Sequence, residues 1–407
     1  MLTAVAGLGV HLVAELVLRP DAVRSNVLDG FSQRLVGDES IATDLVGTPQ
    51  RHFSECIAFS ILTNPRVEGA LSRIMKMEAN LWTPPETICS TYLAGTSDTS
   101  QVQWFSYARY WHGYLILHKV ILSFVDYRAF LKLINALLVS ALVIFAVTLA
   151  SRFQLFPTLV LLVVFLLLSP SLWSWLNPGV AISFSSLLLV GAYFDRYAAD
   201  RLWPDAASAA VFAGAVFNFF DFLYFPALLA AMLCWLAAIH QVGSRAATID
   251  RTPLLLGMVS LAGYLAMWAV KWLIGLGWSH FEPVQAPMVG DFSRWMFGGG
   301  GPYVPFAATV SILDRLLQPM LSLGLVCVVA AAYLLLAIRF RTPFLLYTLR
   351  TSILPAALAV FVLEGMARHS LAHGFSGWVV AWLVAMLAFN CARYVNLPPL
   401  RPRSSER

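Results

Sequence analysis

The chain has 407 residues, of which 59% are hydrophobic and 12% are charged, and its mean hydropathy is +0.73. Soluble domains carry about 25% charged residues, so the composition excludes an ordinary soluble domain and indicates an all-α, polytopic integral membrane protein. The net charge of +5 lies on loops beside apolar segments. We interpret it as an orientation signal and expect no nucleic-acid partner.

Segments of about 20 apolar residues can cross a bilayer as helices. Ten segments approach this length, and we predict spans near 2–18, 131–150, 156–173, 179–195, 205–220, 224–240, 254–277, 318–338, 344–365 and 375–393. The fifth and sixth could together form one bent helix. The first resembles a signal peptide in length, but it lacks a basic start and contains His11 and Glu15, so we expect it to be retained.

Basic residues predict which side of the membrane each loop occupies, because short cytoplasmic loops are enriched in Lys and Arg. If the tail at 394–407 is cytoplasmic, alternation places Arg152, Arg196, Arg245 and Arg339 on the same side. The opposite loops at 174–178 and 220–223 contain no Lys or Arg. With ten spans both termini are cytoplasmic. Arginine outnumbers lysine 23 to 4 and no Asn-X-Ser/Thr sequon is present, which favours a bacterial inner (plasma) membrane.

Half of the acidic residues, 11 of 22, lie in the predicted extracytoplasmic loop at 19–130. We expect this loop to contain juxtamembrane helices, one of them lying in the membrane interface at 114–127. The bundle segments at 131–278 and 318–393 follow, separated by an outward loop at 279–317. That loop contains four consecutive glycines at 298–301, which favour a hinge or lid and do not form a P-loop.

Five acids in the first outward loop are candidate functional residues. A carboxylate beside a membrane can be a general base, a ligand of a divalent cation or a solvated loop charge. Solvation explains any single one, but we expect at least one to be functional. Asp29 ranks first from its distance to the first span, and Glu55 second because its apolar neighbours would raise its pKa by burial. The others are Asp38, Glu39 and Asp44.

Two charged residues lie beside the predicted outer ends of spans. Lys271, between Trp268 and Trp272, either extends to the lipid headgroups or binds the phosphate of a lipid-linked substrate. Asp221, flanked by Phe220 and Phe222, is either the polar tip of a short loop or an acid with a catalytic or structural role.

Further substrate-binding candidates are aromatic and basic residues of the outward loops. Trp111 and His112 either stack on a sugar or headgroup or anchor the chain at the interface. His369 and His373 are four residues apart, a spacing that zinc uses, but no third ligand is evident. We therefore expect these histidines and Arg368 to contact a substrate phosphate, and we predict no metal site in this motif.

Five cysteines occur without C-x-x-C spacing, so a metal or redox centre is not predicted. Cys56 and Cys89 both fall in the loop at 19–130 and could pair if that loop is periplasmic. We favour the alternative of two unpaired, buried thiols.

One short first span, a long outward loop with early acids and many later spans of uneven length resemble the GT-C glycosyltransferases. These membrane enzymes use polyprenyl-phosphate sugars. The resemblance covers the overall architecture. It implies a catalytic acid in the first outward loop, which Asp29 or the pair Asp38-Glu39 matches. Patches such as Arg109-Tyr110-Trp111-His112-Gly113 and Phe220-Asp221-Phe222-Leu223 are similar to ones in bacterial membrane proteins of surface-polysaccharide metabolism.

The resemblance implies an inverting reaction in which an outward carboxylate deprotonates the acceptor hydroxyl. Lys271, Arg368 or Arg109 would offset the charge of the departing lipid phosphate. The implied partners are a lipid-linked sugar donor, a glycan or lipid acceptor and membrane lipids. No cofactor is required, although a divalent cation stays open. A transporter or flippase, or a non-catalytic envelope assembly factor, is the alternative function.

Overall fold

The structure is a computed structural model, and all structural statements concern the residues that it describes. These are residues 2–33, 35–36, 53–64, 69–80, 88–97, 104–106, 111, 113–168, 178–199, 201–221, 225–242, 251–278, 320–365 and 376–396.

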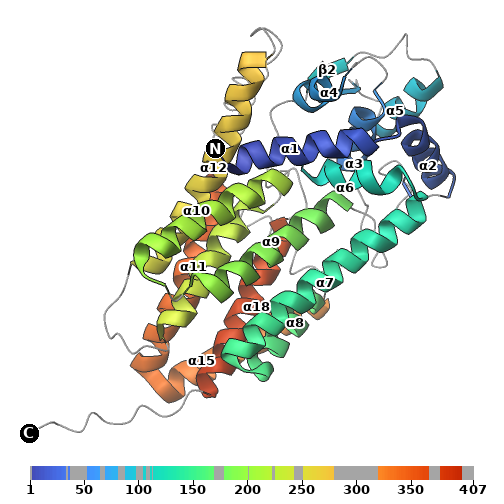
Figure 1. Cartoon of the computed structure of the whole chain (residues 1–407). Helices are drawn as coiled ribbons and strands as arrows, with labels where there is room; N and C mark the ends of the chain where they lie inside the picture. The colour runs from blue at the N-terminus through green and yellow to red at the C-terminus, as the bar shows by residue number, and fades with distance from the viewer. Residues whose placement is uncertain are drawn as a thin grey trace, which may run out of the picture.

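Apolar helices form the larger part of the molecule (Figure 1). The bundle contains α7 (Tyr127–Phe153), α8 (Leu155–Leu168), α9 (Pro178–Tyr197), α10 (Trp203–Phe220), α11 (Pro226–Val242), α12 (Thr252–Trp278), α15 (Met320–Thr348), η3 (Leu349–Ile353), α16 (Leu354–Gly365) and α18 (Ser376–Val395). Among the described residues, six helices are long and apolar enough to cross a membrane, and a bent pair raises the number to seven. The all-α, polytopic membrane class is confirmed, whereas the count of ten spans stays a prediction.

Large apolar side chains cover the outside of this bundle. Examples exposed by more than half are Val143 and Val147 on α7, Val163 on α8 and Ile338 on α15. A soluble monomer rarely exposes such continuous apolar surface, whereas hydrocarbon chains of a bilayer solvate it. The exposed side chains therefore indicate the faces that contact lipid.

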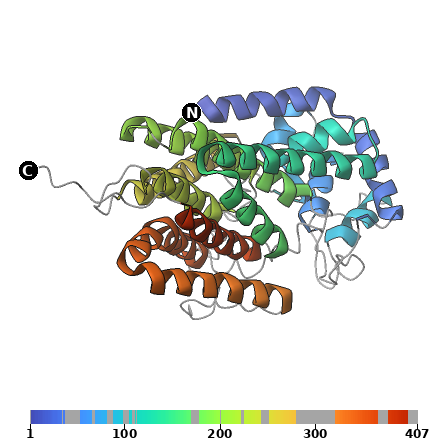
Figure 2. The ribbon, with the colours of Figure 1, turned by 90° about the horizontal axis from the view of Figure 1, so that it is seen from below.

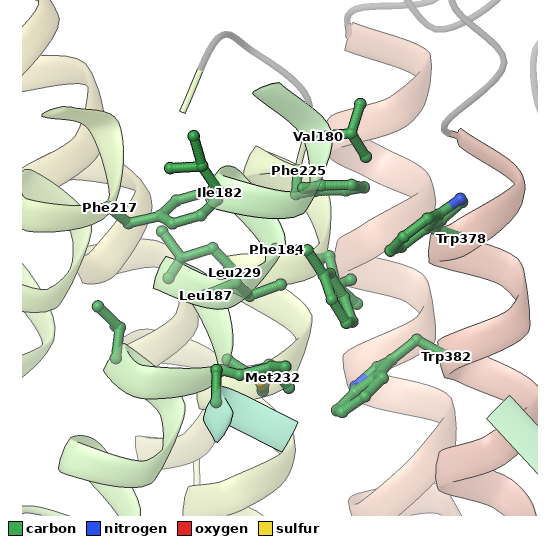
Figure 3. Close-up of a cluster of buried hydrophobic side chains, with 14 of the residues drawn as sticks. Val180, Ile182, Phe184, Leu187, Phe217, Phe225, Leu229, Met232, Trp378 and Trp382 are labelled. Atoms are coloured by element: carbon green, nitrogen blue, oxygen red, sulfur yellow. The ribbon is translucent and has the colours of Figure 1, made fainter. Parts of the chain in front are cut away.

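Helix α11 forms the centre of the bundle. Its residues from Ala227 to Ile239 are all buried, as expected for a helix that is apolar around its whole circumference. Beside it, aromatic rings of α9 and α18 interlock (Figure 3). The Phe184 ring centroid lies 4.8 Å from that of Trp378 and 5.6 Å from that of Phe225. These contacts join α9, α11 and α18 near one end of the bundle.

Helices α10 and α12 approach closely because glycines occupy their interface. A Cβ atom at Gly214 would overlap the carbonyl oxygen of Ser260, and one at Gly263 would overlap that of Val211. Membrane helices gain little from burying apolar surface against one another, so close backbone packing of this kind supplies much of their association.

Two arginines bind backbone carbonyl groups at one end of the bundle. Arg152 donates to the carbonyl of Arg196 at 2.9 Å, and Arg393 donates to that of Ile239 at 2.9 Å. Asp195 and His240 form a side-chain pair at 2.7 Å in the same region. We refer to this end as the inner end, following the predicted orientation, and to the opposite end as the outer end.

The segment before α7 folds against the outer end as short elements. They are α1 (Leu2–Val17), α2 (Pro20–Ser32), α3 (Phe53–Leu62), α4 (Ala70–Lys76), β1 (Glu78–Asn80), α5 (Ile88–Ser97), β2 (Trp104–Ser106) and α6 (Tyr114–Leu122). Strands β1 and β2 pair antiparallel, with Ala79 opposite Phe105. Buried residues of α3 and α4 belong to the same core as the bundle. Helix α6 buries most of its side chains in protein, so the prediction of an interfacial helix at 114–127 is wrong.

Cys56 of α3 and Cys89 of α5 form a disulfide. The expectation that both thiols are unpaired is therefore wrong. The error arose because the 33-residue separation carries no information on proximity, whereas α3 and α5 pack together in the fold. Disulfides persist in oxidising compartments, so the bridge favours an extracytoplasmic location for this segment.

Helix α1 and helix α2 are the bent pair that could form a seventh span, so the predicted first span at 2–18 stays a prediction. Helix α1 has 16 residues, and it meets α2 at an angle of 83°. Figure 1 shows α1 lying across the outer end of the bundle, and Figure 2 shows α1 and α15 at opposite edges of the molecule. Its contact with α10 is at Phe219, which lies next to the last residue of that helix.

Replacing Gly214 by Ala should separate α10 from α12. The added methyl group overlaps the Ser260 backbone, and overpacking of this kind destabilises a protein by about 1–3 kcal/mol. Thermal unfolding in detergent micelles should show a lower Tm. Gly9→Ala is the matched control, since a Cβ at Gly9 meets nothing within 4 Å. An unchanged Tm for Gly214→Ala would contradict the close packing of these helices.

Candidate functional site

Four charged side chains from four elements meet at the outer end. Glu15 of α1 forms salt bridges to Arg73 of α4, at 2.7 Å, and to Lys119 of α6. Lys271 of α12 joins these residues through α4, because its ammonium donates to the carbonyl of Ile74, the residue after Arg73. The side chains of Glu15 and Lys119 are at most 3% exposed and Lys271 is buried, whereas that of Arg73 is 24% exposed. We call these four residues the charged cluster.

Lys271 is held by a backbone carbonyl and an aromatic ring. Its ammonium donates to the carbonyl of Ile74 at 3.1 Å and lies 5.3 Å from the ring centroid of Trp111. Since Lys271 is fully buried in protein, it does not extend to the headgroups in the way that one sequence interpretation suggested. A buried ammonium favours a nearby anion or a cation–π contact.

Trp111 belongs to the wall of this region. The indole N–H donates to the carbonyl of Met267 at 2.9 Å, and its own carbonyl is 2.9 Å from Nε2 of His11. Trp111 is 2% exposed, so it is not an anchor at the lipid surface. Phe219 packs against both Trp111 and His11, which brings α1, α10 and α12 together here.

Glu55 lies on α3 at the N-terminus of α9. One carboxylate oxygen accepts a hydrogen bond from the Gly179 backbone N–H at 3.1 Å, where free N–H groups and the helix dipole favour an anion. The other oxygen has no hydrogen-bond partner among the described residues. Burial raises the pKa of Glu55 to about 7, and the Gly179 bond only partly opposes this. The raised pKa of Glu55 agrees with the prediction made from its apolar neighbours in the sequence.

His118 lies on α6, packed between the rings of Phe59 and Phe130. Its Nδ1 lies 3.0 Å from the Tyr114 carbonyl, so Nδ1 carries the proton. Burial lowers the pKa of this imidazole to about 4, which keeps it neutral at pH 7. Burial likewise lowers the pKa of the adjacent Lys119, while Glu15 opposes that change.

Asp221 follows the last residue of α10. Its carboxylate accepts from the Tyr264 hydroxyl at 2.9 Å and from the Phe225 backbone N–H at 3.4 Å. At 3% exposed it is not a solvated loop tip. Asp221 therefore ties α10, α12 and the start of α11 together, and it lies two residues from Phe219 beside the charged cluster.

Asp29 lies on the exposed side of α2. Its carboxylate accepts from the side-chain amide of Gln33 at 2.6 Å, and its backbone carbonyl accepts from Ser32 at 2.7 Å. These local bonds stabilise the end of α2. They leave the carboxylate accessible, so Asp29 stays a predicted catalytic acid.

The remaining predicted site residues lie outside the described residues. They are Asp38, Glu39, Asp44, Arg109, His112, Arg368, His369 and His373. Of the predicted residues that the structure does describe, Trp111, Asp221 and Lys271 come together at the outer end, whereas Asp29 is on the surface of α2. Within the described part of the chain, no group of three His, Cys, Asp or Glu side chains could hold a metal ion.

Sequence reasoning missed Glu15, Arg73 and Lys119 as site residues. A signal for Glu15 existed, because His11 and Glu15 are four residues apart and share one face of an apolar helix. Lys119 likewise interrupts an apolar run at 114–122. Arg73 has no comparable signal, since it lies in a polar segment.

The fold and this site define a polytopic helical membrane protein with buried charges at one end of its bundle. No protein-family model, no curated protein and no solved structure matches the chain.

The disulfide can be counted chemically. Denatured, unreduced protein should take up maleimide-polyethylene glycol at three cysteines (Cys234, Cys327 and Cys391) and at all five after reduction. Five additions before reduction would show that Cys56 and Cys89 are free. Closing a loop of 33 residues stabilises a protein by about 4 kcal/mol in the chain-entropy account, so Cys56→Ser should lower the Tm, whereas Cys327→Ser should not.

Glu55 should make stability fall as pH rises. Its pKa is about 7 when folded and 4.5 ordinarily, so the folded protein binds the proton more tightly. Stability from this group is complete below pH 4.5 and lost as pH rises through 7, by about 3 kcal/mol in total. The Tm difference between the wild type and Glu55→Gln should therefore change across this range. Asp21→Asn, an exposed acid of α2, should leave the pH profile unaltered; the same profile for both variants would contradict the burial of Glu55.

Proposed function

We propose that this protein is a membrane glycosyltransferase that moves a sugar from a polyprenyl-phosphate donor to a cell-envelope glycan or lipid acceptor. The observation that carries the proposal is the charged cluster, in which Glu15 pairs with Arg73 and Lys119 while the buried ammonium of Lys271 has no acid beside it among the described residues. A buried cation of this kind suits a phosphate group, because a buried charge without a counter-charge is unfavourable. A lipid-linked donor would present its phosphate near this level of a membrane.

The reaction follows from these charges. A carboxylate accepts the proton of the acceptor hydroxyl, whose oxygen forms a bond to the anomeric carbon. The bond between that carbon and the phosphate oxygen breaks, and the lipid phosphate leaves with the electron pair. Lys119 and Lys271 stabilise the charge that develops on it. Attack opposite the leaving group inverts the configuration.

Four acids are proposed for the proton transfer. Asp29 is accessible on α2, and Asp38 and Glu39 follow it in sequence. The pKa of about 7 at Glu55 suits a general base at neutral pH, although its bond to Gly179 gives it a structural role as well. Glu55→Gln separates these two roles. The glutamine side chain cannot act as a base, but its amide oxygen can still accept the hydrogen bond from Gly179 at the start of α9.

The reaction is proposed to occur on the extracytoplasmic face of a bacterial inner membrane. The disulfide supports an oxidising location for the outer end, and the arginines at the inner end agree with a cytoplasmic side. In this arrangement the C-terminus is cytoplasmic. The proposed partners are the lipid-linked donor, its acceptor and membrane lipids.

A transporter or flippase is the second candidate, and one observation favours it. The span at 343–365 contains the π-helical segment η3, whose Thr351 carbonyl accepts from Asn390 of α18 at 2.9 Å. Interrupted spans and π segments often occur at transport or other functional sites. Such a protein would move the lipid-linked sugar without breaking its bond to phosphate.

Deletion of the gene should remove a sugar from an envelope glycan or lipid and raise the amount of a polyprenyl-phosphate sugar. Mass spectrometry of both fractions measures this. Complementation with Lys271→Gln should reduce transfer by about tenfold to a hundredfold, since hydrogen bonds to charged groups contribute about 1.5–3 kcal/mol. Asp29→Asn, Asp38→Asn, Glu39→Gln and Glu55→Gln should be tested in the same cells.

Lys132→Gln is the matched control, because Lys132 is an exposed lysine of α7. Unchanged glycans in the deletion strain, or full transfer by all four acid variants, would overturn the glycosyltransferase proposal. Accumulation of the donor on the inner leaflet alone would favour the flippase.

A further inference from the structure

The charged cluster carries more positive than negative charge. Glu15 pairs with Arg73 and Lys119, whereas Lys271 has no acid beside it in the described part of the chain, so its positive charge is uncompensated there. Three of the four are buried, so water screens them little. Such an arrangement favours binding of a further anion.

Lys119 and Lys271 differ in their contact with Glu15. Lys119 pairs directly with Glu15. Lys271 makes no salt bridge among the described residues, and its one hydrogen bond there is to the Ile74 carbonyl. An ammonium has three N–H donors, so Lys271 retains capacity for an anionic oxygen.

We propose that Lys119 and Lys271 form a binding site for a phosphate ester, and that Glu15 is a built-in competitor that occupies part of this site. Without ligand, the Glu15 carboxylate bridges Lys119 and Arg73 and compensates one of their two positive charges. A bound phosphate takes over contacts to Lys119, which weakens the attachment of α1 at Glu15. Arg73, the most exposed of the four, marks the side from which the anion enters.

Competition between Glu15 and phosphate predicts that removal of the Glu15 charge increases the affinity for phosphate. Neutralising Glu15 removes the negative charge beside Lys119 and frees that ammonium, so phosphate binding should become tighter. A Glu15 that only anchors α1 would have the opposite effect, because its loss would loosen the cluster and weaken binding. The identity of the ligand as a lipid-linked donor rests on the proposed function; the anion site itself does not.

The test measures dissociation constants by thermophoresis on full-length protein in phosphatidylcholine nanodiscs. The probes are citronellyl phosphate, a short isoprenyl phosphate, and inorganic phosphate. We expect Glu15→Gln to bind citronellyl phosphate about tenfold more tightly and Lys271→Gln about tenfold more weakly, as for charges a few ångströms apart at a partly screened site. Asp21→Asn and Lys132→Gln, exposed residues of the same types, should bind like the wild type.

A second, milder variant distinguishes altered binding from misfolding of the protein. Glu15→Asp keeps the charge but shortens the side chain, so it should tighten binding by about threefold and melt near the wild-type temperature. Equal or weaker binding by both Glu15 variants, with normal melting curves, would overturn the competition. Unaltered binding by Lys271→Gln, or no binding of either probe by the wild type, would overturn the anion site.

The remaining outcomes identify the source of the phosphate. Tighter binding of citronellyl phosphate than of inorganic phosphate supports an isoprenyl ligand. Equal binding, or loss of binding in discs that contain phosphatidylglycerol, keeps the anion site and contradicts the donor. The predicted pattern of binding together with unchanged envelope glycans would keep this inference and overturn the proposed function.

Discussion

Charges withdrawn from both water and lipid must find partners inside the protein, and this constraint shapes the outer end. Glu15 can be buried only because Arg73 and Lys119 reach it, and their pairing fixes α1 against α4 and α6. Lys271 then connects α12 to α4 through the Ile74 carbonyl. Elements far apart in sequence are thereby joined by a few polar contacts. Lipid-facing surfaces elsewhere need no such pairing, and they are correspondingly apolar.

The class of fold could be predicted from the sequence, because hydropathy reports directly on the cost of placing polar groups in lipid. Helices α9, α12 and α18 begin and end within a few residues of the predicted spans. The first segment was harder. Residues 2–18 are apolar enough to suggest a straight crossing, yet α1 is one arm of a bent pair with α2, and burial of His11 and Glu15 requires partners from other segments. Hydropathy alone does not predict which distant segments supply the partners of buried polar residues.

The site was only partly predictable for a related reason. Lys271 and Asp221 stand out as charges in apolar surroundings, and the structure places both at the outer end. Arg73 and the Cys56–Cys89 bridge depend on tertiary proximity, which no local pattern encodes. Glu55 shows both aspects: its apolar neighbours predict burial, but its position at the start of α9, 124 residues later, follows only from the fold.

The enclosure of α11 has a consequence for assembly. A helix of 17 residues with no lipid-facing side does not have to match the thickness of the bilayer. During folding, however, contacts with other helices must replace lipid contacts on every side of α11. Its neighbours α9 and α12 flank it closely in sequence, whereas α16 and α18 emerge from the ribosome much later. The core around α11 therefore becomes complete only after α16 and α18 have been synthesised, late in the growth of the chain.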